Sequence, residues 1–226
     1  MTDRKKATEH SPRPSAFTRV RRLPERGFYD AQSVYDILDA ATHCHVAHLI
    51  GTQPVATPTL HWRVADRVYW HGSVASRMLK ATPAPARVCL TATIIDGWVL
   101  ARSAFNHTAN YRSAMCFGAP EVISDTAEKG RLLEALTERL FPRRWSLLRP
   151  MTRKELGATT VLSLPLDESS AKIRVGPPED PARDLEWPVW AGVIPLKQSV
   201  GKPIADGGVS RGLKPPKLPA AKRSKL

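Results

Sequence analysis

The amino-acid sequence predicts a mainly β domain of the α+β type, an antiparallel β-barrel with a few flanking helices. Six or more short segments between residues 44 and 175 are rich in β-branched and aromatic residues, and turn residues separate them. The chain has no Gly-x-Gly-x-x-Gly motif and no regular alternation of strand and helix patterns, which argues against a parallel sheet. Closing antiparallel strands into a barrel removes exposed sheet edges.

Length and charge distribution indicate one domain with two basic ends. The chain has 226 residues and a formal net charge of +13, of which the first and last 30 residues contribute +11. We therefore expect a folded domain over residues 19–196, a disordered segment over residues 1–18 and a disordered basic tail over residues 197–226. We interpret the tail as solvating rather than as a nucleic-acid contact, which stays an alternative.

Cysteine usage and hydropathy favour a cytoplasmic protein. Cys44, Cys89 and Cys116 are far apart and form no Cys-x-x-Cys pair, so we expect buried free thiols in a reducing compartment. The N-terminal segment has no apolar stretch typical of a signal peptide, and no window approaches the roughly 18 apolar residues of a spanning helix. We expect no membrane contact.

The first expected helix follows a structured turn at residues 22–30. Asp30 can cap it, and its apolar positions fall on one face suited to covering a sheet. These positions are Val34, Ile37, Leu38 and Ala41.

Three strands and a second helix are expected next. Strand character occurs in residues 44–50, 55–64 and 67–70. Ala65-Asp66 fits a tight hairpin between the last two strands. Residues 73–80 predict a short helix that Pro83 and Pro85 end.

Asp96-Gly97 is the strongest hairpin signal in the chain. It separates the apolar segments 88–95 and 98–105, which we expect to pair with each other.

The second half predicts three more strands and one helix. Residues 111–123 read as a long strand with a bulge at Gly118. Asp125 or Thr126 caps a helix whose apolar stripe is Leu132, Leu133, Leu136 and Leu140. The last two strands are expected at 159–166 and 171–175.

The segment from Gly176 to Leu196 is rich in proline, which argues against regular structure. It is nevertheless too apolar for a solvated tail, since it contains Trp187, Val189, Trp190, Val193 and Ile194. We expect it to lie along a protein surface, its own or that of a partner subunit.

The stretch from Tyr69 to Arg77 has the composition of a phosphate site. A phosphate needs backbone N–H groups, small side chains, hydroxyl donors and a guanidinium. Ser73, Ser76 and Arg77 supply the side chains. Ser73 also fits an ordinary N-cap, and Arg77 also fits a solvated helix residue.

Two further clusters favour a flavin site. Tyr111, Arg112 and Ser113 follow a loop next to the predicted hairpin, which we expect to place them beside the first cluster, and Lys172 and Arg174 add two cations. Flavin mononucleotide (FMN) needs a phosphate site, polar groups along its ribityl chain, backbone donors at the ring edge and an apolar wall. Arg112 also fits a simple cation on a sheet surface.

Other chemistries have less support. On a strand, His43 and His45 share one face while His48 takes the other, and no cysteine or carboxylate lies at a ligand spacing. We therefore expect no metal site. The absence of a Gly-x-Ser-x-Gly motif argues against a hydrolase.

Six motifs carry a resemblance to a known family. In chain order they are Arg-x-Leu-Pro-x-Arg-Gly, Tyr-x-His-Gly-Ser-x-x-Ser-Arg, Asp-Gly-x-Val-Leu-Ala-Arg-Ser-Ala-Phe, Asn-Tyr-Arg-Ser-x-x-x-Phe-Gly, Lys-x-Arg-x-Gly-Pro-Pro and Pro-Val-Trp-Ala-Gly-Val. Together they resemble the pyridoxamine 5′-phosphate oxidase-related flavin-binding proteins, and more narrowly the branch that contains 5-nitroimidazole reductases. The resemblance spans about residues 19–196.

The resemblance implies a split β-barrel homodimer with one FMN per subunit at the interface. Ser76 and Arg77 would hold the phosphate, with Ser73 in the same turn, and His71 would sit beside the flavin as a positioning or proton-donating group. Thr57, Pro58, Thr59 and Leu60 would run along the ring edge and offer backbone donors. Other cofactor contacts would come from Tyr111, Arg112, Ser113, Lys172, Arg174 and Trp190, the last three at the rim.

The function implied is an FMN-dependent oxidoreductase that passes electrons from a reduced donor to a small acceptor, such as a nitroaromatic or a quinone. Met78 departs from the pattern of the true oxidases, which have a lysine after the Ser-Arg pair, so pyridoxamine phosphate oxidase activity is in doubt. The alternative is a non-catalytic protein that carries or senses a flavin or a haem. A deazaflavin in place of FMN also stays open.

Overall fold

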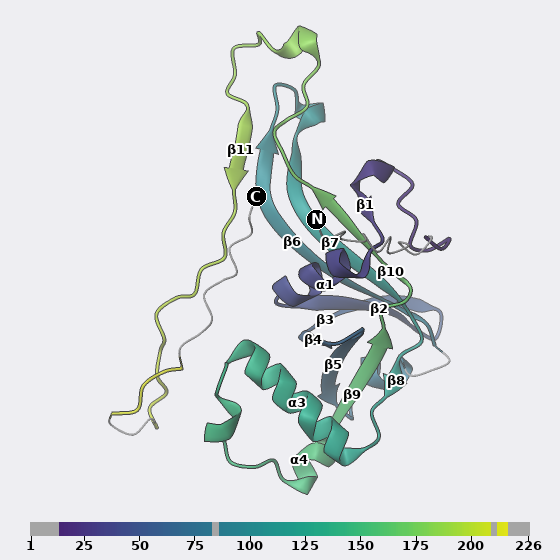
Figure 1. Cartoon of the computed structure of the whole chain (residues 1–226), viewed down its shortest axis with the longest axis vertical. Coiled ribbons are helices and arrows are strands. Elements are labelled where there is room, and N and C mark those ends of the chain that lie inside the picture. The colour runs from purple at the N-terminus through teal and green to yellow at the C-terminus, as the bar shows by residue number, and fades with distance from the viewer. Residues whose placement is uncertain (1–13, 83–85, 209–211, 217–226) are drawn as a thin grey trace, which may run out of the picture.

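The structure is a computed structural model that describes residues 14–82, 86–208 and 212–216. Two antiparallel sheets form its framework (Figure 1). The first contains β1 (Gly27–Phe28), β2 (Cys44–Ile50), β3 (Gln53–Thr59), β6 (Val88–Leu100), β7 (Thr108–Gly118), β10 (Ser169–Arg174) and β11 (Gly192–Pro195). The second contains β4 (His61–Val64), β5 (Arg67–Ser73), β8 (Glu121–Val122) and β9 (Thr159–Pro165).

Strand order defines which residues can share a site. The first sheet runs β1-β10-β7-β6-β2-β3, with β11 paired to β6 as well, and the second runs β4-β5-β9-β8. β2 and β11 both pair with β6 but at different positions, His45 with Thr91 and Val193 with Val99. β3 therefore forms one edge of the first sheet and β1 the other.

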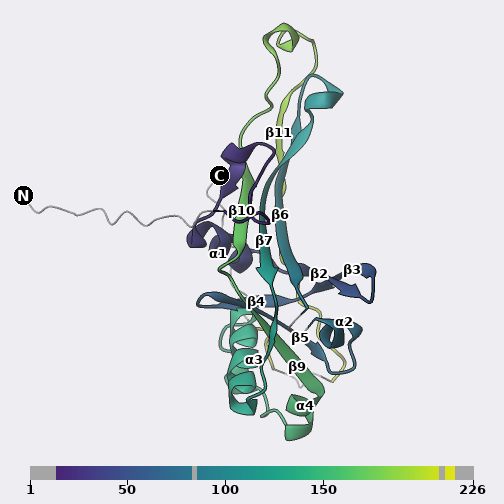
Figure 2. The ribbon, with the colours of Figure 1, turned by 90° about the vertical axis from the view of Figure 1, so that its right-hand side faces the viewer.

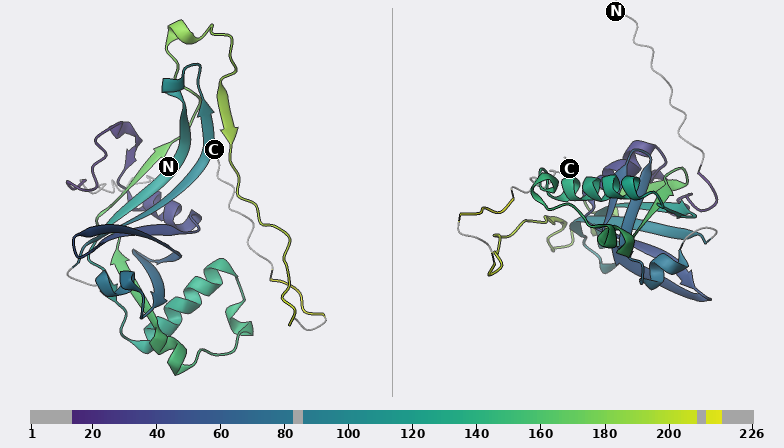
Figure 3. Two further views of the ribbon diagram at one scale, coloured as in Figure 1. Left: turned by 180° about the vertical axis from the view of Figure 1, so that it is seen from behind. Right: turned by 90° about the horizontal axis from the view of Figure 1, so that it is seen from below.

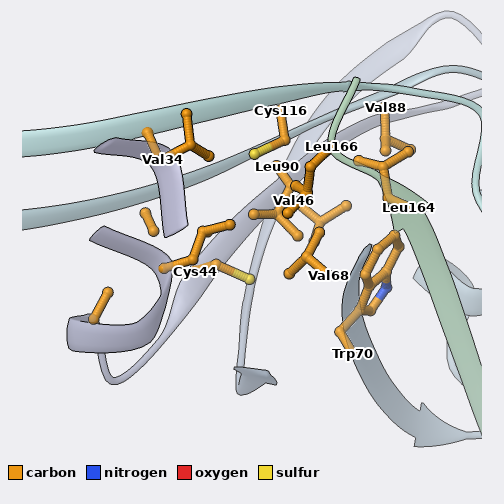
Figure 4. Packing of buried hydrophobic residues seen from close by; sticks show 14 of the residues in the cluster. Val34, Cys44, Val46, Val68, Trp70, Val88, Leu90, Cys116, Leu164 and Leu166 are labelled. Atoms are coloured by element: carbon orange, nitrogen blue, oxygen red, sulfur yellow. The ribbon is translucent and has the colours of Figure 1, made fainter. Parts of the chain in front are cut away.

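The two sheets pack face to face around one large apolar core (Figure 4). Val46, Leu90 and Cys116 of the first sheet meet Val68 and Trp70 of the second, and all five are fully buried. This arrangement confirms the predicted mainly antiparallel split barrel with few helices. The sheets do not close into a continuous barrel in the described part of the chain.

Two predicted helices are confirmed together with their caps. In α1 (Ala31–Ala40), the Ser33 N–H donates to Asp30 Oδ1 at 2.8 Å, and the predicted apolar face is buried. In α3 (Thr126–Leu140), the Glu128 N–H donates to Asp125 Oδ1 at 2.6 Å. α1 contacts β10, β7 and β6 of the first sheet and β4 of the second, whereas α3 lies on the second sheet alone (Figure 3).

The sequence analysis did not predict helix α4 (Arg153–Ala158). It begins with a capping box in which the Thr152 hydroxyl accepts from the Glu155 N–H and the Glu155 carboxylate accepts from the Thr152 N–H. The spacing Thr-x-x-Glu was visible in the sequence and signals such a start.

The predicted hairpin at Asp96-Gly97 is wrong. β6 continues through these residues to Leu100, and the turn to β7 lies at residues 101–107 with the short helix η2 (Ala104–Asn106). A long hairpin results, and it protrudes beyond the rest of the molecule together with β11 (Figure 2). We call residues 95–110 and 175–196 the arm, and the remaining residues up to 174 the body.

Tertiary contacts explain why Asp96-Gly97 does not turn. Arg112 Nε and Nη2 donate to the two carboxylate oxygens of Asp96, each at 2.7 Å, and Asp96 is buried at a bulge in β6. A Cβ on Gly97 would lie 3.0 Å from the Ile194 carbonyl oxygen, so glycine permits the close approach of β11. These contacts override the local turn preference.

Other boundaries also differ from the prediction. The strand expected at 55–64 breaks at Leu60, where the chain leaves the first sheet for the second. The helix expected from Ser73 begins at Arg77 as α2 (Arg77–Ala81). The bulge expected at Gly118 lies at Asp96 instead, because the β6–β7 register shifts only there.

The proline-rich segment is more regular than predicted, since Gly192–Pro195 forms strand β11. At the N-terminal end, Ser15 Oγ donates to Glu168 at 2.9 Å and Thr18 is buried, while residues 1–13 of the predicted disordered segment lie outside the described residues. Residues 198–208 and 212–216 contain no helix or strand. Pro83 and Pro85, expected to end α2, also lie outside the described residues.

The cysteine prediction holds for two of three thiols. Cys44 and Cys116 are free and buried, and Cys89 is free and partly buried. Burial raises the pKa of Cys44 to about 12 and raises that of Cys116 further. No helix among the described residues is long and apolar enough to cross a membrane.

Candidate functional site

The first candidate cluster lies where β5 ends and α2 begins. The Ser76 N–H donates to the Ser73 carbonyl oxygen at 2.8 Å, and the Ala75 N–H donates to Ser73 Oγ at 3.2 Å. Ser76 is the N-cap of α2, yet its hydroxyl makes no capping hydrogen bond. The N-cap is therefore Ser76 and not Ser73, whereas the exposed Arg77 side chain agrees with the alternative of a solvated helix residue.

Arg77 follows this turn with an exposed side chain. Among the residues that the structure describes, no carboxylate lies within ion-pair distance of it. Met78, which replaces a lysine of the oxidase pattern, is buried in the core and not part of the turn. An unpaired guanidinium, a free hydroxyl and a tight turn are the groups that an anion requires.

His71 sits six residues before Arg77 on β5. Its ring contacts Trp62 edge-on, with 5.8 Å between ring centres. Nδ1 is buried and has no hydrogen-bond partner within the described chain. Burial lowers the pKa of His71, so the imidazole is neutral at pH 7.

The segment Thr57–Leu60 occupies the open edge of the first sheet, because β3 is its last strand. Prolines in edge strands place the missing N–H toward solvent. Pro58 pairs with His45, and on this rule Thr57 and Thr59 direct their N–H groups into the β2–β3 ladder. The N–H of Leu60, outside both strands, is then the main donor that this segment offers a ligand.

The structure places the second cluster and the first cluster on different sheets. Tyr111, Arg112 and Ser113 lie on β7 of the first sheet, whereas His71 lies on β5 of the second. β6 and β2 also separate β7 from β3. From the register, Tyr111 and Pro58 are roughly 20 Å apart.

Several predicted cofactor contacts have structural partners instead. Arg112 is held by Asp96, and its pKa is raised by that hydrogen-bonded pair. Arg174 is buried and donates to the Asn110 side chain and to the carbonyl oxygens of Gly176 and Pro177. Lys172 Nζ donates to the Arg22 carbonyl oxygen at 3.2 Å.

Tyr111 and Ser113 lie on a sheet face that no helix of the described residues covers. Val46, Leu90 and Cys116 pair in register and point into the core, so their neighbours His45, Thr91 and Met115 point to the opposite face. We call this opposite face of the first sheet the open face. By the same alternation it includes Pro58, Thr93, Ile95, Tyr111, Ser113 and Lys172.

Trp190 belongs to the arm and lies far along the chain from the first cluster. Its ring packs over Gly192, where a Cβ would come within 2.8 Å of it. The side chain remains mostly exposed. No group of three potential metal ligands occurs among the described residues.

Comparison with known proteins identifies the family. Residues 30–173, more than half of the chain, match the family model of pyridoxamine 5′-phosphate oxidase. The chain belongs to this family. The resemblance inferred from the sequence motifs is thereby confirmed.

Two solved structures resemble most of the chain. The flavocytochrome Anf3 from Azotobacter vinelandii has 43% sequence identity and a TM-score of 0.86, covering 90% of this chain and 94% of its own. The FAD and haem binding protein from Mycobacterium smegmatis has 38% identity and a TM-score of 0.80, covering 84% and 94%.

A third structure, a candidate 5-nitroimidazole antibiotic resistance protein from Bacteroides thetaiotaomicron, shares the fold at 22% identity and a TM-score of 0.53. It covers 65% of this chain and 86% of its own. A search of curated proteins gave no match.

Two residues that matter for the arm were missed by the sequence reasoning. The local pattern marks Asp96 as a turn residue, but it forms the ion pair with Arg112. The pattern places His107 in a polar loop, but its Nδ1 lies 2.8 Å from the Ser103 carbonyl oxygen. A histidine beside a loop carbonyl leaves no local sequence signal.

Proposed function

We propose that this protein is a flavin-binding oxidoreductase that holds the phosphate end of its flavin at Ser76 and Arg77. The observation that carries the proposal is a set of polar groups within residues 71–77 that have no partner among the described residues: the exposed Arg77 guanidinium, the Ser76 hydroxyl, which makes no capping bond, and the buried Nδ1 of His71. The guanidinium and the hydroxyl suit an anion, and a bound ligand would offset the cost of the unpaired buried nitrogen.

The two relatives that match most of the chain support a flavin and extend the proposal to a haem. One is a flavocytochrome and the other is an FAD and haem binding protein. The sequence motifs imply FMN, whereas the second relative binds FAD. Both flavins have a phosphate next to the ribityl chain, so Ser76 and Arg77 suit either.

The residues of this chain would bind and tune the cofactor. A bound flavin supplies two-electron chemistry, and a bound haem supplies one-electron chemistry. His71 is neutral at pH 7 because burial lowers its pKa, so it can exchange a proton at Nε2 beside the ring. The Leu60 N–H would donate to the ring edge.

We also propose that two copies complete the site. Pro58 and Tyr111 are on the same open face but roughly 20 Å apart in one chain. A second copy laid on the open face would bring the Tyr111–Ser113 cluster of one chain toward the Thr57–Leu60 edge of the other. Analytical ultracentrifugation should give a dimer, and a monomer with bound flavin would refute this part.

The absorption spectrum of the purified protein tests flavin binding. We expect flavin bands, and mass spectrometry of the released cofactor should identify FAD or FMN. Removing the charged hydrogen bonds of Arg77 with Arg77→Ala should weaken flavin binding by about 10- to 100-fold. Arg131→Ala on α3, an exposed arginine, is the control that should leave affinity unchanged.

Two results would contradict the binding proposal. One is a lack of flavin bands even after FAD or FMN is added, and the other is equal flavin affinity in Arg77→Ala and Arg131→Ala.

Electron transfer is tested separately. We expect oxidation of reduced nicotinamide with a nitroaromatic or quinone acceptor, slowed in His71→Ala while flavin stays bound. A protein that binds flavin but reacts with no donor and acceptor pair would be a carrier and not an oxidoreductase.

A further inference from the structure

A haem iron needs an axial ligand, and histidine imidazole is the commonest in proteins. Six histidines lie in the described part of the chain: His43, His45, His48, His61, His71 and His107. A ligating histidine usually donates one ring N–H to a carbonyl or carboxylate, which directs the lone pair of the other nitrogen at the metal. The six can be compared on this criterion.

Two of them are enclosed by protein. His48 and His61 each have one ring nitrogen near a backbone carbonyl, of Val46 at 3.1 Å and of Leu38 at 2.9 Å. Their second nitrogens are buried and lack partners. The porphyrin of a haem cannot reach these two ring nitrogens, because protein atoms enclose them.

Three others lack the fixing bond. The His43 ring lies 3.2 Å from the Thr42 hydroxyl, while His45 and His71 make no ring hydrogen bond within the described residues. His71 also belongs to the turn that we assign to the flavin.

His107 meets the criterion. Its Nδ1 lies 2.8 Å from the Ser103 carbonyl oxygen, and since a carbonyl only accepts, Nδ1 carries the proton. The lone pair is then on Nε2. The side chain is exposed at the end of the arm.

The loop that carries His107 is fixed by a buried carboxylate. Asp180 accepts from the Arg102 backbone N–H at 3.1 Å, from Arg102 Nη1 at 3.0 Å and from Asn106 Nδ2 at 3.5 Å. Although burial alone would raise it, the pKa of Asp180 is lowered by these hydrogen bonds. The loop between residues 102 and 107 is therefore held in place from a segment 78 residues away.

Apolar surface lies next to His107, as a porphyrin requires. In the register of the arm, Trp98 faces Ala109 on β7 and Ile194 on β11, and alternation puts these on the continuation of the open face. Trp98 is 50% exposed and Phe105, two residues from His107, is 92% exposed. Arg183, in the short helix η4 (Ala182–Asp184) of the arm, adds an exposed cation for propionate groups, although its Nε lies 3.7 Å from the neighbouring Asp184 carboxylate.

We propose that His107 is the axial ligand through which this chain holds haem on the apolar face at the end of its arm. The assignment rests on the haem binding proposed above. In it, Nδ1 donates to the Ser103 carbonyl, Nε2 binds the iron, and Trp98 and Phe105 contact the porphyrin. The haem site is thus on the arm and the flavin phosphate site on the body.

The test uses the full-length chain titrated with haemin, followed by the Soret band and by haem content. Wild type should give a Soret band typical of histidine ligation. His107→Ala should lower haem affinity at least tenfold, whereas His43→Ala and His45→Ala, the matched controls at exposed histidines, should keep the Soret band. Imidazole added to His107→Gly should restore the wild-type spectrum, which a merely structural role would not produce.

The outcomes separate the two proposals. A wild type with flavin bands but no Soret band after haemin addition refutes haem binding itself. A wild type that binds haem, with an unchanged Soret band in His107→Ala, overturns the assignment alone. If the alanine and glycine variants do not fold, His107→Cys decides, because a thiolate ligand must change the spectrum and an unchanged spectrum overturns the assignment.

Discussion

The body and the arm place the same residue type in opposite environments. Trp62 and Trp70 in the body are fully buried, whereas Trp187 in the arm is 67% exposed and Trp190 is 61% exposed. A buried tryptophan stabilises the fold that encloses it, while clustered exposed aromatics are surface left for another molecule. The body is thus stabilised by its own core, whereas the arm leaves apolar side chains exposed, as the proposed contacts with a haem or a second copy require.

The largest expected effect comes from replacing a buried tryptophan of the body, and an exposed tryptophan of the arm serves as its control. Trp70→Ala empties space between the two sheets and should lower the free energy of unfolding by about 3–5 kcal/mol. Trp187→Ala should change it by less than about 0.5 kcal/mol in the cofactor-free chain at low concentration. Urea unfolding followed by circular dichroism measures both. Equal losses would show that the arm has a core of its own.

A buried histidine of the body, His61, should make the free energy of unfolding depend on pH. Burial lowers the pKa of His61 to about 4, only partly offset by its hydrogen bond to Leu38, while the unfolded chain takes up this proton near pH 6.5. Stability due to His61 is therefore complete above pH 6.5 and decreases as the pH falls toward 4. The loss should reach about 3 kcal/mol.

His61→Gln should remove this slope, because glutamine does not titrate. His107→Ala, a change in the arm, should keep it. Unfolding free energies measured from pH 7 to pH 4 give the comparison, and equal slopes in wild type and His61→Gln would exclude His61 as the source.

The body was largely predictable because its signals are local. Asp30 and the spacing of Val34, Ile37 and Leu38 define α1 within a dozen residues, and the structure confirms it. The family motifs similarly contain the turn at Ser76 and Arg77. Helix α4 shows that a readable local signal, the Thr152–Glu155 capping box, was overlooked.

The arm was poorly predictable because its geometry depends on distant partners. Asp96-Gly97 has the local chemistry of a hairpin turn, but Arg112 on β7 and Ile194 on β11 keep it extended. The position of His107 likewise depends on Asp180, which is far away in the sequence. Sequence pattern alone contains neither contact.

Asp96 joins the two regions, and its loss should have an intermediate effect. Asp96→Asn removes the charge that pairs with both donors of Arg112 at a largely buried position, and should cost about 2 kcal/mol. The exposed pair of Arg67 with Glu121 is the control, and Glu121→Ala should cost less than about 1 kcal/mol. Thermal unfolding measures both, and equal costs would show that the Asp96 pair is no more than a surface contact.

The smallest expected effect isolates β11 from the rest of the fold. A Cβ at Gly97 would meet the Ile194 carbonyl oxygen at 3.0 Å and Val193 Cγ1 at 3.1 Å, so Gly97→Ala should push β11 away from β6. Because β11 contributes little to the core, global stability should fall by no more than about 1 kcal/mol. Hydrogen exchange should instead accelerate selectively at residues 192–195. Gly130→Ala on α3, where a Cβ meets nothing within 4 Å, should act in the opposite direction and stabilise the chain by about 0.5–1 kcal/mol. Faster exchange throughout the body in Gly97→Ala would mean that arm and body unfold as one unit.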